Sequence, residues 1–85
     1  MRRINQDHVS AKIDILNRLL GFENAKHSTI GSIQLYGDQS GWKLHLIMNE
    51  YGGVTSVTET GTLRETAAAV QGMIAATRIA LGERP

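Results

Sequence analysis

Most of the side chains that could recognise a ligand lie in the middle of the chain. Tyr36 and Trp42 have aromatic faces that can stack on any nucleobase. Asn49 carries both a donor and an acceptor, which suits the hydrogen-bonding edge of adenine. Gly52 and Gly53 let backbone N–H groups come close to a phosphate. These residue types together predict recognition of a nucleotide.

Two further side chains complete the candidate ligand site. Arg64 falls in the first turn of a predicted helix, where backbone N–H groups and the guanidinium can hold a phosphate together. A solvated surface arginine is the alternative. His45 falls within a predicted strand and titrates near neutral pH, although most surface histidines have no chemical role. Trp42 shares a strand face with Leu44 and Leu46, so a core position also stays open for it.

No pattern of a catalytic or metal site occurs in the sequence. It has no nucleophile elbow, no phosphate-binding loop motif, no zinc-binding helix motif and no carboxylate pair spaced for acid–base work. It has no cysteine, and its three histidines are scattered, which predicts neither a disulfide nor a metal site. We therefore expect a protein that is not an enzyme and that uses no metal or cofactor.

Length and charge narrow the class of protein further. The 85 residues suffice for one domain, and a domain of this size often relies on oligomerisation. Nine basic and eight acidic residues give a net charge of +1, without the basic excess typical of duplex nucleic-acid binding. No apolar run approaches the roughly 20 residues of a membrane span, and the basic start lacks the apolar region of a signal peptide. We expect a cytoplasmic protein without strong nucleic-acid binding and without a membrane partner.

The first predicted element is a helix that begins at Asn5, a favoured N-cap, and stops at Gly21. Ile4 and Val9 have the spacing of a hydrophobic staple. Its apolar stripe consists of Val9, Ile13, Leu16 and Leu20. Its polar side is predicted to hold Asp7, Ser10, Asp14, Asn17 and Arg18.

Three strands follow at about residues 30–36, 42–49 and 54–58. Glycine-rich turns separate them, and glycine adopts a positive φ at little cost. Alternation in the middle strand puts Trp42, Leu44, Leu46 and Met48 on one face. It puts Lys43, His45, Ile47 and Asn49 on the other face, which Tyr36 shares. A slip of one residue would exchange the two faces.

The last predicted helix begins at Thr62 with a capping box, Thr62 and Glu65, and runs to about Leu81. Its core stripe is Val70, Met73, Ile74, Thr77 and Leu81. A second stripe holds mostly small residues: Ala68, Gly72, Ala75 and Ile79. Two stripes indicate a helix that packs on its own sheet and on a partner, whereas an alanine-rich weakly polar surface is the alternative.

The predicted fold is therefore α+β, a single domain over residues 1–85 with the order α-β-β-β-α. A three-stranded antiparallel sheet carries both helices on one face. The second stripe of the last helix predicts a homo-oligomer. We expect the ligand pocket between the sheet, the turn from Asn49 to Gly53, and the start of the last helix, beside Arg64.

Two segments together resemble short proteins encoded by tailed phages and prophages. Ile4, Asn5 and His8 match an I-N-x-x-H pattern, and residues 44–54, LHLIMNEYGGV, match the segment of that family that ends in N-E-x-G-G-V. The turn at residues 37–41 is longer than the Gly-Gly turn expected there. The resemblance implies a phage protein that acts in the cytoplasm of the host cell.

A more distant resemblance is to the anti-Thoeris sponge proteins of phages, which sequester cyclic nucleotide immune signals in pockets between protomers. Those pockets use an aromatic residue, an asparagine and an arginine, which correspond to Trp42 or Tyr36, Asn49 and Arg64, although this chain is shorter than that family. The resemblance implies a phage anti-defence protein that binds and sequesters a cyclic nucleotide without catalysis.

Two other functions remain open. One is a phage accessory or inhibitor protein that acts through protein–protein binding. The other is a double-stranded RNA-binding domain, because that family has the same order of elements. Its lysine cluster at the start of the second helix is replaced here by Leu63-Arg64-Glu65-Thr66, and fold order alone is an analogy.

Overall fold

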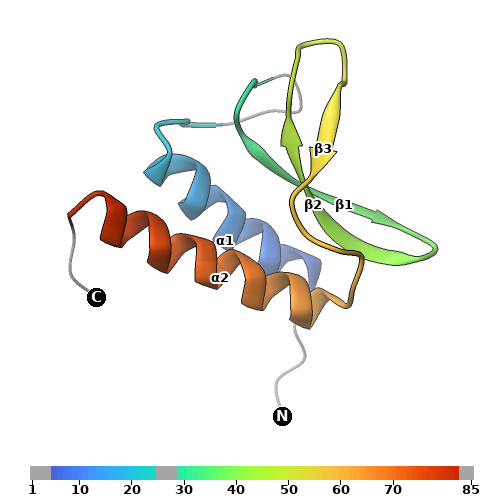
Figure 1. Cartoon of the computed structure of the whole chain (residues 1–85). Coiled ribbons are helices and arrows are strands. Elements are labelled where there is room, and N and C mark those ends of the chain that lie inside the picture. The colour runs from blue at the N-terminus through green and yellow to red at the C-terminus, as the bar shows by residue number, and fades with distance from the viewer. Residues whose placement is uncertain (1–4, 25–28, 83–85) are drawn as a thin grey trace.

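The computed structural model describes residues 5–24 and 29–82, which form two helices and a three-stranded antiparallel sheet with the strand order β1-β2-β3 (Figure 1). The elements along the chain are α1 (Gln6–Leu19), β1 (Ile33–Asp38), β2 (Gly41–Ile47), β3 (Val54–Ser56) and α2 (Leu63–Ala80). The predicted α+β class and the order α-β-β-β-α are confirmed.

Both helices begin where short-range patterns placed them. The Asn5 side chain accepts a hydrogen bond from the His8 N–H at 2.9 Å, which caps α1. At the start of α2, the Thr62 hydroxyl accepts from the Glu65 N–H and the Glu65 carboxylate accepts from the Thr62 N–H. Gly21 follows α1 with a φ of 95°, as a helix-terminating glycine does. The predicted staple partner Ile4 lies outside the described residues.

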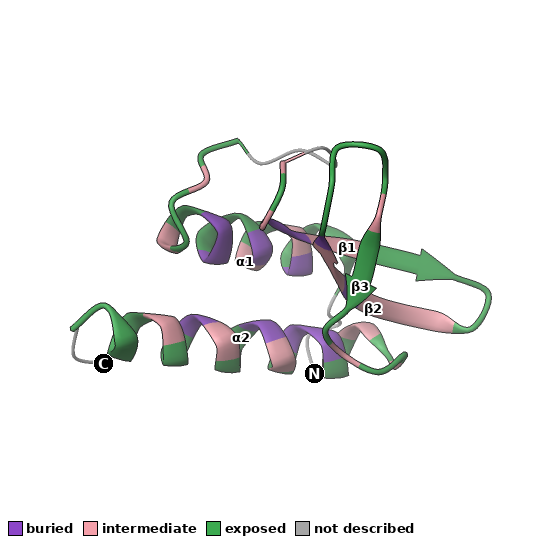
Figure 2. Ribbon diagram, turned by 45° about the horizontal axis from the view of Figure 1, so that its top comes forward, coloured by how far each residue is buried: buried purple, intermediate pink, exposed green. Residues whose placement is uncertain are grey.

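The two helices run side by side in the same direction and lie on one face of the sheet (Figure 1). A hydrogen bond of 2.6 Å from Lys12 Nζ to Gln71 Oε1 joins them near their middles. Figure 2 shows the buried positions of α1 and α2 turned toward each other. The shared core consists of Val9, Ile13, Leu16, Ile33, Leu44, Ala67, Val70 and Ile74.

The register of the sheet confirms the predicted strand faces. Leu35 pairs with Leu44, and both belong to the face that packs on the helices. Tyr36 pairs with Lys43 on the opposite face, which carries His45 as well. We call this opposite side the outer face of the sheet.

The predicted strand ends were less accurate than the faces. β1 begins at Ile33 and not near residue 30, because Gly31 has a φ of 88° and Ser32 bonds back to Thr29 O with its N–H and its hydroxyl. β2 ends at Ile47, so Asn49 belongs to the following loop and not to the strand.

One buried polar residue ties α1 to the edge of the sheet. Asn17 is 3% exposed, and its amide donates to Ile33 O at 2.9 Å and accepts from Ile33 N–H at 2.8 Å. It therefore satisfies the outward backbone groups of an edge strand, as a neighbouring strand would. The prediction that Asn17 lies on the exposed polar side of α1 was wrong, because the helical pattern contains no information about this contact.

The two predicted stripes of α2 are largely present. Val70 and Ile74 are buried, whereas Leu81 is 57% exposed because it follows the last residue of the helix. The second stripe lies on the opposite side of the helix, and its members Ala68, Gly72, Ala75 and Ile79 are all exposed. The helices that the structure describes include none long and apolar enough to cross a membrane.

Candidate functional site

The seven predicted ligand residues fall into three separate groups. Trp42 and Arg64 line one cleft, Tyr36 and His45 lie together on the outer face, and Asn49, Gly52 and Gly53 belong to the β2–β3 loop. Gly41 and Trp42 of the cleft begin β2, whereas the loop follows the last residue of β2, so the loop and the cleft lie at opposite ends of this strand. The seven residues of β2 separate its two ends by about 20 Å at roughly 3.3 Å per residue. The structure therefore does not join the sheet, this loop and the start of α2 in one pocket.

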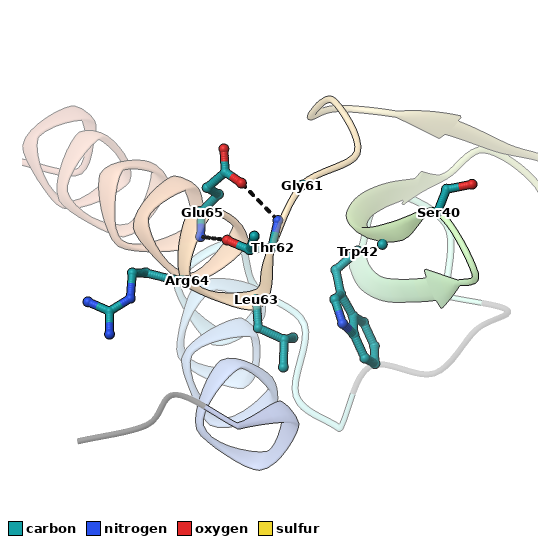
Figure 3. A pocket seen from close by; sticks show the side chains of 8 residues that line it. Ser40, Trp42, Gly61, Thr62, Leu63, Arg64 and Glu65 are labelled. Atoms are coloured by element: carbon teal, nitrogen blue, oxygen red, sulfur yellow. Dashed lines mark hydrogen bonds between the residues drawn. The ribbon is translucent and has the colours of Figure 1, made fainter. Parts of the chain in front are cut away.

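A cleft of about 610 Å³ lies between the β1–β2 hairpin and the first turn of α2 (Figure 3). Two cavities beside α1 measure about 60 and 170 Å³, so the cleft alone among these three reaches the roughly 300–1,000 Å³ of small-ligand sites. Its lining consists of Ser40, Gly41, Trp42, Gly61, Thr62, Leu63, Arg64 and Glu65.

Backbone pairing builds the cleft. The Trp42 N–H donates to Gly61 O and the Gly61 N–H donates to Trp42 O, both at 2.8 Å, which fixes the start of α2 against β2. The indole covers Gly37, where an added Cβ would lie only 2.4 Å from Trp42 Cζ3. Figure 3 shows the indole of Trp42 and the side chain of Leu63 on opposite sides of the cleft. The result is a slot with two apolar walls.

The polar groups at the cleft are arranged around the helix cap. Glu65 Oε1 accepts from the Thr62 N–H at 2.9 Å, and the Glu65 N–H donates to Thr62 Oγ1 at 3.0 Å. Hydrogen bonds that the carboxyl of Glu65 receives from the backbone and from the side chain of Thr62 lower its pKa, so the group is ionised at neutral pH. The positive end of the helix dipole therefore already faces a carboxylate. Arg64 extends from the same turn, away from Trp42 (Figure 3).

Asn49 stabilises its own loop. Asn49 Oδ1 accepts from the N–H groups of Tyr51 and Gly53, both at 2.9 Å. Gly53 lies so close that an added Cβ would approach Asn49 Nδ2 to 2.3 Å, and Gly52 has a φ of 92°. The Gly53 N–H that we expected to bind a phosphate is therefore engaged within the loop. The side chain that the loop presents is Tyr51, which is 88% exposed.

Tyr36 and His45 stack on each other across β1 and β2, with ring centroids 4.6 Å apart and ring planes inclined by 20°. Lys43 Nζ lies 5.8 Å from the centroid of the Tyr36 ring. Partial burial, and then the positive charge of Lys43, lower the pKa of His45 below 6.5. Tyr36 and His45 thus form a stacked pair on a sheet face that the helices leave open.

Several cleft residues were not among the predicted site residues. Leu63 supplies one apolar wall and Glu65 supplies the carboxylate, yet the sequence analysis assigned Glu65 to the helix cap alone. The sequence does contain a signal for Leu63 as a site residue, because an apolar residue there occupies the first position of a capped helix. The sequence contains no signal that Ser40 belongs to the cleft, because only the pairing of Trp42 with Gly61 brings the β1–β2 hairpin beside α2.

Within residues 5–24 and 29–82, no group of three or more histidine or acidic side chains is placed to hold a metal ion. Comparison of the chain with models of protein families, with curated proteins and with solved structures found no match.

Proposed function

We propose that the protein binds a nucleotide without turning it over, with the base held in the cleft between Trp42 and the first turn of α2. The observation that carries this proposal is the cleft of about 610 Å³ with the Trp42 indole and Leu63 as facing walls. A planar base that enters the slot stacks on the indole, a contact worth about 1–3 kcal/mol in single-stranded nucleic-acid complexes.

The polar groups favour a base that has an exocyclic amine. One Glu65 oxygen is held by the Thr62 N–H, so the carboxylate can accept a further hydrogen bond through the other oxygen. Adenine, guanine and cytosine supply such an amine, whereas uracil and thymine do not. Arg64 is also among the residues that line the cleft, but its guanidinium extends away from Trp42 (Figure 3) and makes no part of the base site.

The class of nucleotide follows from the sequence resemblance. A phage protein that sequesters a cyclic nucleotide immune signal needs tight binding and no nucleophile or general base. The cleft supplies the aromatic wall that the sponge resemblance implies, and Arg64 belongs to the first turn of α2 with its guanidinium directed away from Trp42. The asparagine of the resemblance, Asn49, is engaged in its own loop and takes no part in this proposal.

Trp42 provides a direct test because it is the single tryptophan of the chain. Titration of the protein with cyclic mono-, di- and trinucleotides and with cyclic ADP-ribose isomers should quench its fluorescence when a base stacks on the indole. The same ligand should raise the melting temperature, since binding at 100 times Kd adds about 2.7 kcal/mol of stability. A matched pair of adenine and uracil nucleotides tests the Glu65 contact.

Two variants locate the site. Leu63→Ala removes one wall and should weaken binding about tenfold, because a lost side-chain contact of about 1.4 kcal/mol corresponds to that factor. Asn49 follows β2 at the end of the strand away from Trp42, so Asn49→Ala should bind the nucleotide as wild type does. The opposite outcome would place the ligand at the loop. If no nucleotide quenches Trp42 or shifts the melting temperature, the nucleotide proposal fails and protein–protein binding takes its place.

A further inference from the structure

The edge of β1 that faces away from β2 is only partly satisfied. Ile33 turns its N–H and C=O outward to the Asn17 amide, and alternate residues of an antiparallel strand turn their backbone groups to the same side. Leu35 and Gly37 therefore also present an N–H and a C=O outward, and no residue within 5–24 and 29–82 bonds to these groups. Backbone donors and acceptors at this spacing are what another strand binds.

We infer that β1 pairs antiparallel with β1 of a second copy about a two-fold axis at Tyr36, so that two three-stranded sheets become one continuous sheet. The pairing uses one edge on each copy, so it closes as a dimer and does not continue into chains. The edge of β1 is separate from the cleft, and the dimer does not depend on the nucleotide proposal.

The register of this pairing is set by the chain itself. With the axis at Tyr36, Leu35 of each copy lies opposite Gly37 of the other, and every outward N–H and C=O of these two residues gains a partner. With the axis at Leu35, Gly37 would instead meet Ile33, whose backbone groups are already bonded to Asn17. With the axis at Gly37, Leu35 would meet a residue of the hairpin turn.

The side chains on the helix side of the sheet are complementary in size. Gly37 has no side chain, and the Trp42 indole covers it so closely that an added Cβ would collide with the ring. Leu35 is partly buried against the core and lies, in the dimer, opposite Gly37 of the second copy. A leucine opposite a glycine fits beside the indole, whereas two leucines in register would compete for the same space. Each copy thus adds an apolar side chain beside the other copy's Trp42.

On the outer face, the pairing extends an aromatic stack that is already present. Tyr36 stacks on His45 with ring centroids 4.6 Å apart, yet it remains 42% exposed. Directly opposite residues of this kind lie about 4.5 Å apart at their Cα atoms, and aromatic pairs there stabilise a sheet. The two Tyr36 side chains would cover each other. Gln34 of each copy lies opposite Asp38 of the other, so no like charges oppose the contact.

The shape of the molecule leaves room for a second copy. The β1–β2 hairpin projects past the first turns of both helices (Figure 1), and residues 36–38 of β1 are exposed. Antiparallel pairing about Tyr36 directs the body of the second copy beyond the hairpin tip, where the first copy has no helix. The axis is perpendicular to the sheet, so the helices of both copies lie on the same side of the joined sheet.

β1 also lacks the features by which an edge strand avoids pairing. Such strands carry charges or proline, or they are very short. Residues 33–37 include no charge and no proline, whereas β3 at the opposite edge has only three residues. The match of Leu35 with Gly37 and of Tyr36 with itself is a property of this one strand. It selects a second copy over a strand of another protein.

Disulfide trapping tests the position of the axis, because the chain has no cysteine. Tyr36→Cys places two thiols across the axis, and a Cα separation of about 4.5 Å lies within the roughly 4.4–6.8 Å that a disulfide spans. Ser56→Cys is the matched control, since Ser56 is exposed on the same face through its pairing with His45. In a glutathione buffer, Tyr36→Cys should form a covalent dimer at least about tenfold faster than Ser56→Cys, because the thiols have a high effective concentration.

Sedimentation velocity between about 10 μM and about 1 mM tests the association of the wild type, since weak contacts have Kd values in this range. The weight-average mass should rise toward that of a dimer and no further. Tyr36→Lys should stay monomeric, because two ammonium groups would face each other across the axis. Ser56→Lys, with the same charge on the same face, should dimerise as wild type does.

A charge series at Gln34 tests the register. Gln34→Glu opposes a carboxylate to Asp38 of the second copy, whereas Gln34→Lys pairs an ammonium with it. Because each dimer contains this contact twice, the dimer Kd should rise at least about threefold in Gln34→Glu and fall at least about threefold in Gln34→Lys. Equal Kd values in the two variants would contradict the register.

Three further outcomes would overturn the inference. One is a wild-type protein that stays monomeric at about 1 mM. Another is equal rates of disulfide formation in Tyr36→Cys and Ser56→Cys. The third is a dimer that survives Tyr36→Lys but is abolished by Gly72→Glu, which would place the interface on the exposed stripe of α2. The nucleotide titration is repeated on monomeric Tyr36→Lys, so failure of the dimer and failure of nucleotide binding are distinguished.

Discussion

Replacement of Asn17 by alanine should destabilise the protein far more than loss of one polar side chain usually does. Asn17 forms two hydrogen bonds with the backbone of Ile33, at 2.8 and 2.9 Å, and both residues are 3% exposed. In Asn17→Ala the N–H and C=O of Ile33 lose their partners inside the protein. Each buried unsatisfied group costs about 1–3 kcal/mol, so the expected loss is about 2–6 kcal/mol.

That loss is large against the total stability. A domain of 85 residues has roughly 4–13 kcal/mol of folding free energy at about 0.05–0.15 kcal/mol per residue. Urea unfolding followed by Trp42 fluorescence and by circular dichroism measures the change. With a denaturant slope of about 1 kcal/mol/M, the midpoint should fall by at least about 2 M.

Asn49→Ala is a matched control for this experiment. Asn49 likewise accepts two backbone hydrogen bonds, both at 2.9 Å, but it is exposed, so water replaces the lost partner. Its cost should stay below about 1 kcal/mol. Equal losses in Asn17→Ala and Asn49→Ala, or a loss below about 1 kcal/mol in Asn17→Ala, would refute the argument that burial of the Ile33 backbone sets the magnitude.

Three further variants test the packing of the sheet, the exposed side of α2 and the charge beside His45. Gly37→Ala places a Cβ 2.4 Å from the Trp42 indole and should cost about 1–3 kcal/mol by overpacking. Gly72→Ala meets no atom within 4 Å and should gain about 0.5–1 kcal/mol in its helix; thermal unfolding compares the two. Lys43→Ala should raise the pKa of His45 partway toward 6.5, measured by NMR titration, because burial still lowers it. A lowered folded-state pKa destabilises the fold as pH falls through that pKa, so wild type should lose more stability on acidification below pH 6.5 than Lys43→Ala.

The sequence alone was sufficient where the deciding interactions span only a few residues. Asn5 caps α1 through His8, and Thr62 and Glu65 form the capping box of α2, so both helix starts follow from residue type and spacing. The faces of β2 follow as well, because alternate side chains of a strand point to opposite sides. The α-β-β-β-α order follows from these local patterns.

The local structure of the middle of the chain could be predicted less well, because residues such as Asn49 fit both a strand and a loop. Asn49 continues the alternation of β2, and the sequence analysis placed it in the strand. Its hydrogen bonds from Tyr51 N–H and Gly53 N–H instead fold it into the loop. The position of Asn17 in α1 was likewise ambiguous. The helical period places Asn17 among polar residues, whereas its hydrogen bonds with the Ile33 backbone bury it against the edge strand β1.

The tertiary structure alone decided which side chains meet at a site. Trp42 and Asn49 are near in sequence, yet an extended strand advances about 3.3 Å per residue and carries them to opposite ends of the sheet. Trp42 and Leu63 are far apart in sequence, yet the pairing of Trp42 with Gly61 brings them to the two walls of one cleft. Local patterns fix the direction of each side chain within its element, whereas strand pairing fixes the distances between elements.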